Sequence, residues 1–521
     1  MAASTDAASK ARPAPWTLSR ERAAVLALLA VGVAWLGFEL ALRIRHEASG
    51  FYASDTPLFR AVGRGILNGL NPYVDLFEYK PPGIFLVYAF SFAWFGDDQL
   101  HVTLQVAASL VCAFLPACLL LPDRRRDDFW PRLLTALAGG MLVALYSARR
   151  AGELQVEPPG ALFAILFAAR LATGNPREWL RTLECSLWLF LAVGLKEPFL
   201  LTTWAAAIVI HGLGRGTIRE IVATAVLTTL VAVVALASLG LLAPAFQVYL
   251  PEMLGTHIHL YGPLWSRGFE LARLASDLGS FSLGLLVLMA FLLVARAVEG
   301  ARTGGAFALV RGVAEVLLVL VLAAYAVGMG GQYFGHHMVF ATPLWVATIV
   351  WATQRERADA LKRALPWVVA ACLLVAAIDH HRAPYEAQRR RFARALERSR
   401  TVAAEIDRIL EQCGRDRYVF LGRNGHRPYA HTRHSPYGPA FAQYLYTLDP
   451  AYPTLRDGML RSLDETLLVV EQRNRALGPF NDEIEARLRA NFRTDVVPEC
   501  ARSVVRTPAS VAQYAFYFRT E

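Results

Sequence analysis

The chain has 521 residues, of which 55% are hydrophobic and 18% are charged, and its mean hydropathy is +0.35. A soluble core of this size cannot bury so much apolar surface, so the composition excludes an ordinary soluble protein and predicts residence in a lipid bilayer. The formal net charge of +10 does not indicate a nucleic-acid partner, because the basic residues are divided among short stretches between apolar runs.

Apolar runs recur from Ala23 to Ala377, and each approaches the roughly 20 residues that cross a bilayer. We expect an all-α polytopic membrane domain at residues 23–378, with about 11 transmembrane helices. The expected spans are residues 23–42, 101–121, 133–146, 160–173, 183–195, 198–213, 220–243, 280–295, 313–329, 338–353 and 366–378. The basic segment 1–22 precedes the first run, so it is expected to be cytoplasmic, and an odd number of spans then leaves the C-terminus outside.

The apolar run at residues 84–95 is expected to lie along the outer membrane surface. A span there would move Arg124 to Arg126, and every later basic stretch, to the outer side. A run of about 12 residues is also the length of an interfacial or re-entrant helix. Residues 43–100 therefore form one large first outer loop.

After Asp379 the chain becomes charged, and helical spacing of apolar residues runs from Phe392 to Leu410. Short β-like runs follow at Tyr418 to Leu421 and at Leu467 to Val470. Residues 379–521 are therefore expected to form a small α/β extracytoplasmic domain.

The six cysteines divide between the two parts of the chain. Four lie in expected spans, and Cys413 and Cys500 lie in the terminal domain. An extracytoplasmic compartment preserves disulfides, so we expect a bond between these two. Two unpaired thiols stay open as the alternative, because the sequence does not show how closely the Cα atoms approach.

The first outer loop carries the strongest functional pattern. Asp55, "NGLNPY" (68–73), "YKPPG" (79–83) and "WFG" (94–96) occur in this order. The order resembles the first outer loop of the GT-C superfamily of membrane glycosyltransferases, in the protein-mannosyltransferase and aminoarabinose-transferase-like branch. Many members of that branch have an Asp-Glu pair where this chain has Asp55-Thr56.

The resemblance implies a GT-C-like fold in the bacterial inner membrane. It also implies an inverting glycosyltransferase that moves a sugar from a polyprenyl-phosphate donor to a periplasmic glycan, lipid or protein. Weaker matches continue to about residue 380. Glu157, with Glu153 as the alternative, resembles the family's second acidic site, and Lys196 lies in a segment that resembles a turn between two spans. Residues 330–343 resemble a late outer loop with an aromatic residue and a histidine.

The chemistry of such a transfer needs a base and cationic groups. Asp55 is the candidate base for the acceptor's proton, and Glu157 is a second catalytic candidate. The leaving phosphate needs cationic donors, for which the candidates are Lys80, Lys196, Arg149 and Arg150. Further candidates for substrate contact are Tyr73, Tyr333, His336 and His337.

No metal or cofactor is expected, because a cationic side chain can replace the divalent ion. His336 and His337 are adjacent, so they point in different directions on a helix, and no carboxylate pattern accompanies them. Asp55 has a structural alternative as the N-cap of a helix that begins at Thr56 and Pro57. At the level of function, the alternatives are a polytopic transporter and a non-catalytic membrane scaffold or sensor.

Overall fold

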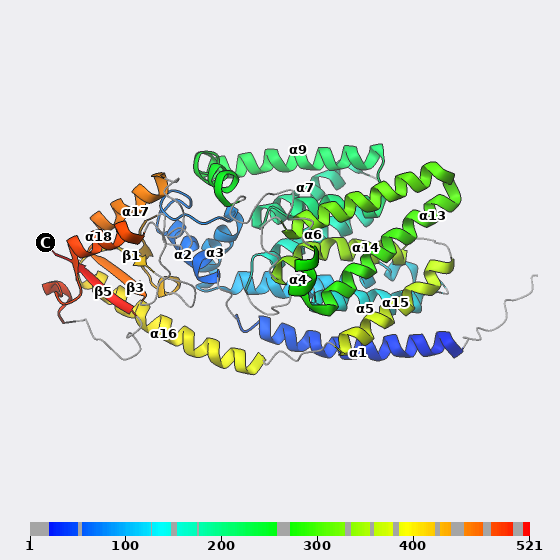
Figure 1. Ribbon diagram of the computed structural model, residues 1–521, viewed down its shortest axis with the longest axis horizontal. Coiled ribbons are helices and arrows are strands. Elements are labelled where there is room, and N and C mark those ends of the chain that lie inside the picture. The colour runs from blue at the N-terminus through cyan, green and yellow to red at the C-terminus, as the bar shows by residue number, and fades with distance from the viewer. Residues whose placement is uncertain are drawn as a thin grey trace, which may run out of the picture.

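Figure 1 shows a computed structural model of the chain, in which a long bundle of helices carries a smaller sheet-containing domain at one end. The structure describes residues 20–50, 55–124, 126, 128–146, 154–173, 177–257, 271–328, 335–354, 359–378, 385–421, 428–438, 453–472, 481–503 and 514–520.

Among these residues, five helical segments are long and apolar enough to cross a membrane, so the chain has the character of a membrane protein. They are Ala23–Glu47, Gln99–Asp123, Phe129–Tyr146, Arg215–Ser238 and Gly304–Gly328. They belong to α1 (Arg20–Glu47), α4 (Gln99–Cys118) with η1 (Leu121–Asp123), α5 (Phe129–Tyr146), α9 (Arg215–Ser238) and α13 (Leu271–Gly328).

The expected 11 spans are not confirmed. The other six expected runs also fall on helices, but none of them is among the described segments that are long and apolar enough for a full crossing. They correspond to α6 (Glu157–Ala172), α7 (Glu178–Leu195), α8 (Phe199–His211), the first part of α13, α14 (Thr342–Gln354) and α15 (Asp359–Ile378). Between α9 and α13 lie the short elements α10 (Leu242–Pro244), η2 (Ala245–Tyr249), α11 (Leu250–Glu252) and η3 (Met253–His257).

The range assigned to α13 folds back on itself. A Cβ atom added at Gly312 would lie 2.9 Å from the Cα of Ala297, whereas 15 residues of straight helix span about 22 Å. Gly305, between them, has φ +70°, a conformation that glycine adopts without strain. The two expected spans 280–295 and 313–329 therefore form two arms of one hairpin, which Figure 1 shows in green.

Small residues allow the helices of the bundle to pack closely. A Cβ atom at Gly140 of α5 would meet the carbonyl oxygen of Ala113 in α4 at 2.4 Å, and one at Gly32 of α1 would meet Leu373 of α15 at 2.5 Å. Close backbone approach at glycine and alanine is typical of helix packing in membranes.

Two short helices, α2 (Thr56–Leu67) and α3 (Pro82–Phe95), lie between the bundle and the terminal domain (Figure 1). Each has proline in its first turn, where the missing N–H costs no hydrogen bond. They pack so tightly that a Cβ atom added at Gly63 of α2 would lie only 2.5 Å from the Cβ atom of Tyr88 in α3. Helix α3 has only 14 residues, and its late aromatic residues Trp94 and Phe95 are exposed.

The terminal domain contains α16 (Tyr385–Gln412), α17 (Pro453–Glu465), α18 (Asn481–Asn491) and a five-stranded sheet of order β2-β1-β3-β5-β4. The strands are β1 (Arg417–Leu421), β2 (Ser435–Pro436), β3 (Leu468–Gln472), β4 (Phe492–Arg493) and β5 (Tyr514–Arg519). Strand β1 pairs in parallel with β2 and β3, and β5 pairs antiparallel with β3 and β4. The domain is therefore α/β, as the sequence predicts.

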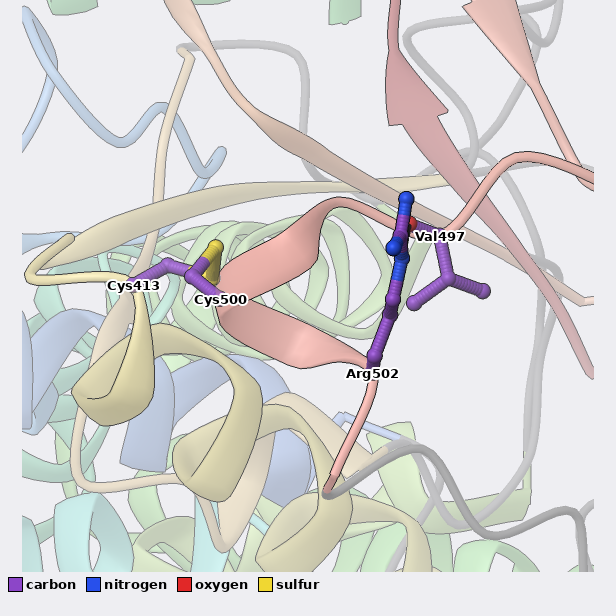
Figure 2. The surroundings of a disulfide bond; sticks show 4 residues. All are labelled: Cys413, Val497, Cys500 and Arg502. Carbon is purple, nitrogen blue, oxygen red and sulfur yellow. Dashed lines mark hydrogen bonds between the residues drawn. A yellow bond between two sulfur atoms is a disulfide. The ribbon is translucent and has the colours of Figure 1, made fainter.

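The bond expected between Cys413 and Cys500 is present, with Cα atoms 5.1 Å apart. It joins the residue after α16 to the short helix η7 (Glu499–Ala501), as Figure 2 shows. The bond closes a loop of 87 residues that contains β1, β2, β3 and β4. The end of α16 is thereby fixed to the far part of the sheet domain.

Side chains of α2 attach the terminal domain to the first loop. The Arg60 Nε donates to the carbonyl oxygen of Ala430 at 3.1 Å, and an Arg64 N–H donates to that of Thr432. The Asn68 amide donates to Ser435 Oγ at 3.0 Å. The Ala430 contact lies in the short helix η5 (Pro428–Ala430), so α2 connects the bundle end to one edge of the sheet.

Candidate functional site

A cluster of charged and imidazole side chains lies at the end of the bundle near α2 and α3. Four separate segments contribute to it: the first loop, the start of α6, the turn between α7 and α8, and η4 (Gly335–Ala341). Its members are Asp55, Glu78, Lys80, Glu157, Lys196, Glu197, His336 and His337.

A backbone contact between two glycines brings the two lysines together. A Cβ atom added at Gly83, in the first turn of α3, would lie 2.3 Å from the carbonyl oxygen of Gly194 in α7. Only glycine permits this approach. Lys80 precedes the first of these glycines by three residues and Lys196 follows the second by two, so both lysines reach the same space.

Aromatic packing brings the remaining segments to the same place. A Cβ atom at Gly160 would lie 2.3 Å from the ring of Phe199, which places the start of α6 against the start of α8. The Phe199 ring also contacts the ring of Phe340 at 5.1 Å, and that ring lies 5.5 Å from the imidazole of His337. Glu157 at the start of α6 therefore lies beside the histidines of η4.

Asp55 lies directly before α2, at its N-cap position, but its carboxylate makes no capping hydrogen bond. Instead, Asp55 Oδ2 lies 3.8 Å from the Nζ of Lys80, which is also 3.5 Å from Glu78 Oε1. The Asp55 side chain is 36% exposed, whereas those of Lys80 and Glu78 are 13% and 1% exposed. Asp55 is thus the carboxylate of this group that is accessible to solvent.

Tyr73 forms a hydrogen bond to the backbone of Lys80 and so helps to position it. Its hydroxyl donates to the carbonyl oxygen of Lys80 at 2.8 Å, and its backbone has φ 82°, which is rare for a residue with a side chain. Its ring packs on Tyr249, centroids 4.7 Å apart, and the Tyr249 hydroxyl donates to Glu197. Burial raises the pKa of both phenols, so both remain protonated donors.

The two buried lysines differ in their proton affinity. Burial alone lowers the pKa of Lys80, but its carboxylate neighbours, Glu78 first, more than reverse this and raise it above the usual value. Burial and the charge of Lys80 lower the pKa of Lys196, and the nearby carboxylates only partly oppose this. The positive charge of Lys80 is therefore balanced by the neighbouring carboxylates, whereas the charge of Lys196 is balanced less completely.

Glu157, His336 and His337 form a compact group whose ligand atoms all lie within 4.8 Å of one another. The Glu157 side chain is 2% exposed, and among the described residues its Oε2 has no hydrogen-bond partner. Burial lowers the pKa of His336, with Glu157 and Asp55 opposing, so its imidazole is more readily neutral. The sequence near the two histidines contains no carboxylate pattern. The carboxylate beside them is that of Glu157, which comes from a different helix, α6.

The structure brings together Asp55, Lys80, Glu157, Lys196 and the two histidines. Arg149, Arg150, Tyr333 and the alternative Glu153 lie outside the described residues. Glu78, Glu197 and Tyr249 belong to the site and were not expected from the sequence. The two glutamates lie within two residues of Lys80 and Lys196, which was a usable signal, whereas nothing in the sequence near Tyr249 pointed to the site.

Comparison of the chain with known protein families, with curated proteins and with solved structures gives no match.

Proposed function

We propose that the protein is a membrane glycosyltransferase that moves a sugar, with inversion, from a polyprenyl-phosphate donor to an extracytoplasmic acceptor. The observation that carries the proposal is the position of Asp55. Its carboxylate is partly exposed and lies 3.8 Å from buried Lys80, in the same charged cluster as Lys196. A base beside cationic groups is what transfer from a phosphate leaving group requires.

The reaction balances with these residues alone. Asp55 accepts the proton of the acceptor's hydroxyl or amine as the acceptor atom bonds to C1 of the sugar. The bond between C1 and the phosphate oxygen breaks, and its electron pair leaves with the polyprenyl phosphate. Lys196 stabilises the developing negative charge on that phosphate. A single displacement of this kind inverts the configuration at C1.

The surroundings of the site support a lipid-linked donor and an acceptor outside the cytoplasm. The five apolar helices are long enough to cross a bilayer, where a polyprenyl chain resides. The site lies at the end of the bundle that carries the terminal domain (Figure 1). The Cys413 to Cys500 bond in that domain favours an oxidising compartment such as the periplasm.

The test is transfer from a radiolabelled polyprenyl-phosphate sugar by purified protein in lipid nanodiscs. Asp55→Asn keeps the size and polarity of the side chain but removes the base, so turnover should fall by about 10²- to 10⁴-fold while donor binding survives. The control is Asp97→Asn, because Asp97 lies in the same loop, is exposed, and only caps the backbone N–H of Gln99. Full turnover by Asp55→Asn would refute the role of Asp55.

A broader result would remove the enzyme assignment itself. If the wild-type protein transfers no sugar from a panel of polyprenyl-phosphate donors to lipid, glycan or peptide acceptors, and binds none of them, the cluster serves another function. Transport of the intact donor, measured with the same purified protein reconstituted into proteoliposomes, separates a transporter from a scaffold.

A further inference from the structure

Glu157, His336 and His337 form a group that the proposed transfer does not use. Two imidazoles and one carboxylate are a donor set that borderline transition-metal ions prefer, whereas Mg²⁺ and Ca²⁺ prefer oxygen ligands throughout. We propose that these three side chains bind one transition-metal ion, with Zn²⁺ as the best fit. The proposal does not rest on the sugar-transfer reaction.

The geometry is close to that of a three-ligand site. The candidate donor atoms lie within 4.8 Å of one another, and tetrahedral Zn²⁺ with bonds of about 2.0 Å holds its ligands about 3.3 Å apart. Rotation of side-chain torsions can close this difference. The histidine rings are 4.6 Å apart and nearly perpendicular, at 83°, so the two imidazoles do not stack against each other.

The burial of Glu157 is a second, independent observation. A carboxylate that is 2% exposed, with one oxygen lacking any hydrogen-bond partner in the described part of the chain, is costly unless a cation compensates it. The Glu157 oxygen lies beside two nitrogen donors. A metal ion in the space between them supplies the missing partner.

The charge of the surrounding cluster also favours a divalent cation. The described members carry four carboxylates and two ammonium groups, a formal net charge of −2 when the imidazoles are neutral. The carboxylates are Asp55, Glu78, Glu157 and Glu197, and the ammonium groups are Lys80 and Lys196. One divalent ion brings this formal charge to zero.

Three protein ligands leave a fourth coordination position open, as in catalytic rather than structural zinc sites. Water or an oxygen of a bound anion can occupy that position.

The experiment measures metal content and affinity in the full-length protein, purified through a tag that contains no histidine. After chelation and dialysis against Zn²⁺, the wild type should retain one equivalent per chain by mass spectrometry. Glu157→Gln and His337→Ala should each weaken Zn²⁺ binding by at least about 100-fold in a chelator competition, since loss of even a second-sphere partner costs about 10- to 100-fold. Substitution with Co²⁺ should give the visible absorption bands of a four- or five-coordinate ion.

Matched controls are Glu184→Gln and His211→Ala. Glu184 pairs with Arg170 on the side of α7, and His211 is exposed at the far end of α8, so both should leave Zn²⁺ affinity unchanged. Glu157→Asp retains the charge and keeps the test valid if Glu157→Gln fails to fold; it should bind Zn²⁺ with intermediate affinity. Absence of retained Zn²⁺ in the wild type, or equal affinity in the site variants and the controls, overturns the proposal.

These outcomes are separable from those of the transfer assay. If the protein transfers sugar in a way that depends on Asp55 but binds no metal, the metal-site proposal is refuted and the proposed function stands. A stoichiometric Zn²⁺ ion in a protein that transfers no sugar would leave the metal site in place and remove the proposed function.

Discussion

The substitution Gly83→Ala tests whether the contact between α3 and α7 builds the site. The added Cβ atom would lie 2.3 Å from the carbonyl oxygen of Gly194, whereas ordinary contact begins at 3.4 Å. The two backbones must therefore separate by about 1 Å, a displacement that can lower turnover by about 100-fold when it moves catalytic groups. Overpacking of this kind also destabilises a protein by about 1–3 kcal/mol.

Gly194→Ala is the matched control, because a Cβ atom there meets nothing within 4 Å. Alanine is a better helix former than glycine, so this variant should gain about 0.5–1 kcal/mol. The assay is thermal unfolding in detergent together with sugar transfer in nanodiscs. We expect a lower midpoint and impaired transfer for Gly83→Ala, and an unchanged or higher midpoint with normal transfer for Gly194→Ala. Equal midpoints and equal turnover in the two variants would refute the role assigned to this contact.

Three further predictions concern the disulfide, the lysine and the topology. Cys413→Ser with Cys500→Ser should destabilise the terminal domain by up to about 4.6 kcal/mol in the chain-entropy model for its 87-residue loop, measured by limited proteolysis. Donor binding should weaken as pH rises through the lowered pKa of Lys196, since its charge is present only below that pKa, and Lys196→Arg should extend binding to higher pH in filter-binding curves. A cysteine at Arg124, in a variant lacking the four unpaired cysteines, should resist an impermeant maleimide in intact cells; its labelling would reverse the expected orientation.

The positions of the helices are largely predictable from the sequence, because a long apolar run is a local signal. The number of spans is harder to predict, since α6 and α14 have only 16 and 13 residues and pack against neighbouring helices. The reversal of α13 at Gly305 shows a similar limit. Residues 280–295 and 313–329 were expected to be separate spans joined by a basic stretch. In the structure they pack against each other, and the stretch between them is also helical.

The sheet illustrates the same distinction. Strands β1 and β3 are short runs of buried apolar residues, which the sequence predicts within a residue or two. Strand β5 pairs antiparallel with β3, from residue 514 opposite residue 472 to residue 518 opposite residue 468. Such pairing depends on tertiary contacts more than on propensity, so the last strand was not expected.

The site divides in the same way. Asp55 and Lys80 could be identified because they occur in one short pattern of the first loop. Glu157 and the histidine pair are about 180 residues apart, and tertiary packing, including that of Gly160, Phe199 and Phe340, places them together. A metal-ligand set assembled from distant helices has no spacing that a sequence can display.

The pKa of Lys80 is raised and that of Lys196 is lowered, which suggests different roles for the two buried lysines. Lys80 has Glu78 at 3.5 Å and Asp55 at 3.8 Å, so its charge is already matched, and its main effect is to hold Asp55 in place. Burial, and after it the charge of Lys80, lower the pKa of Lys196, so its charge is less fully compensated than that of Lys80. A phosphate monoester that binds there relieves the repulsion between the lysines, so anion binding and protonation of Lys196 reinforce each other. For this reason Lys196, rather than Lys80, is the side chain expected to bind the leaving phosphate.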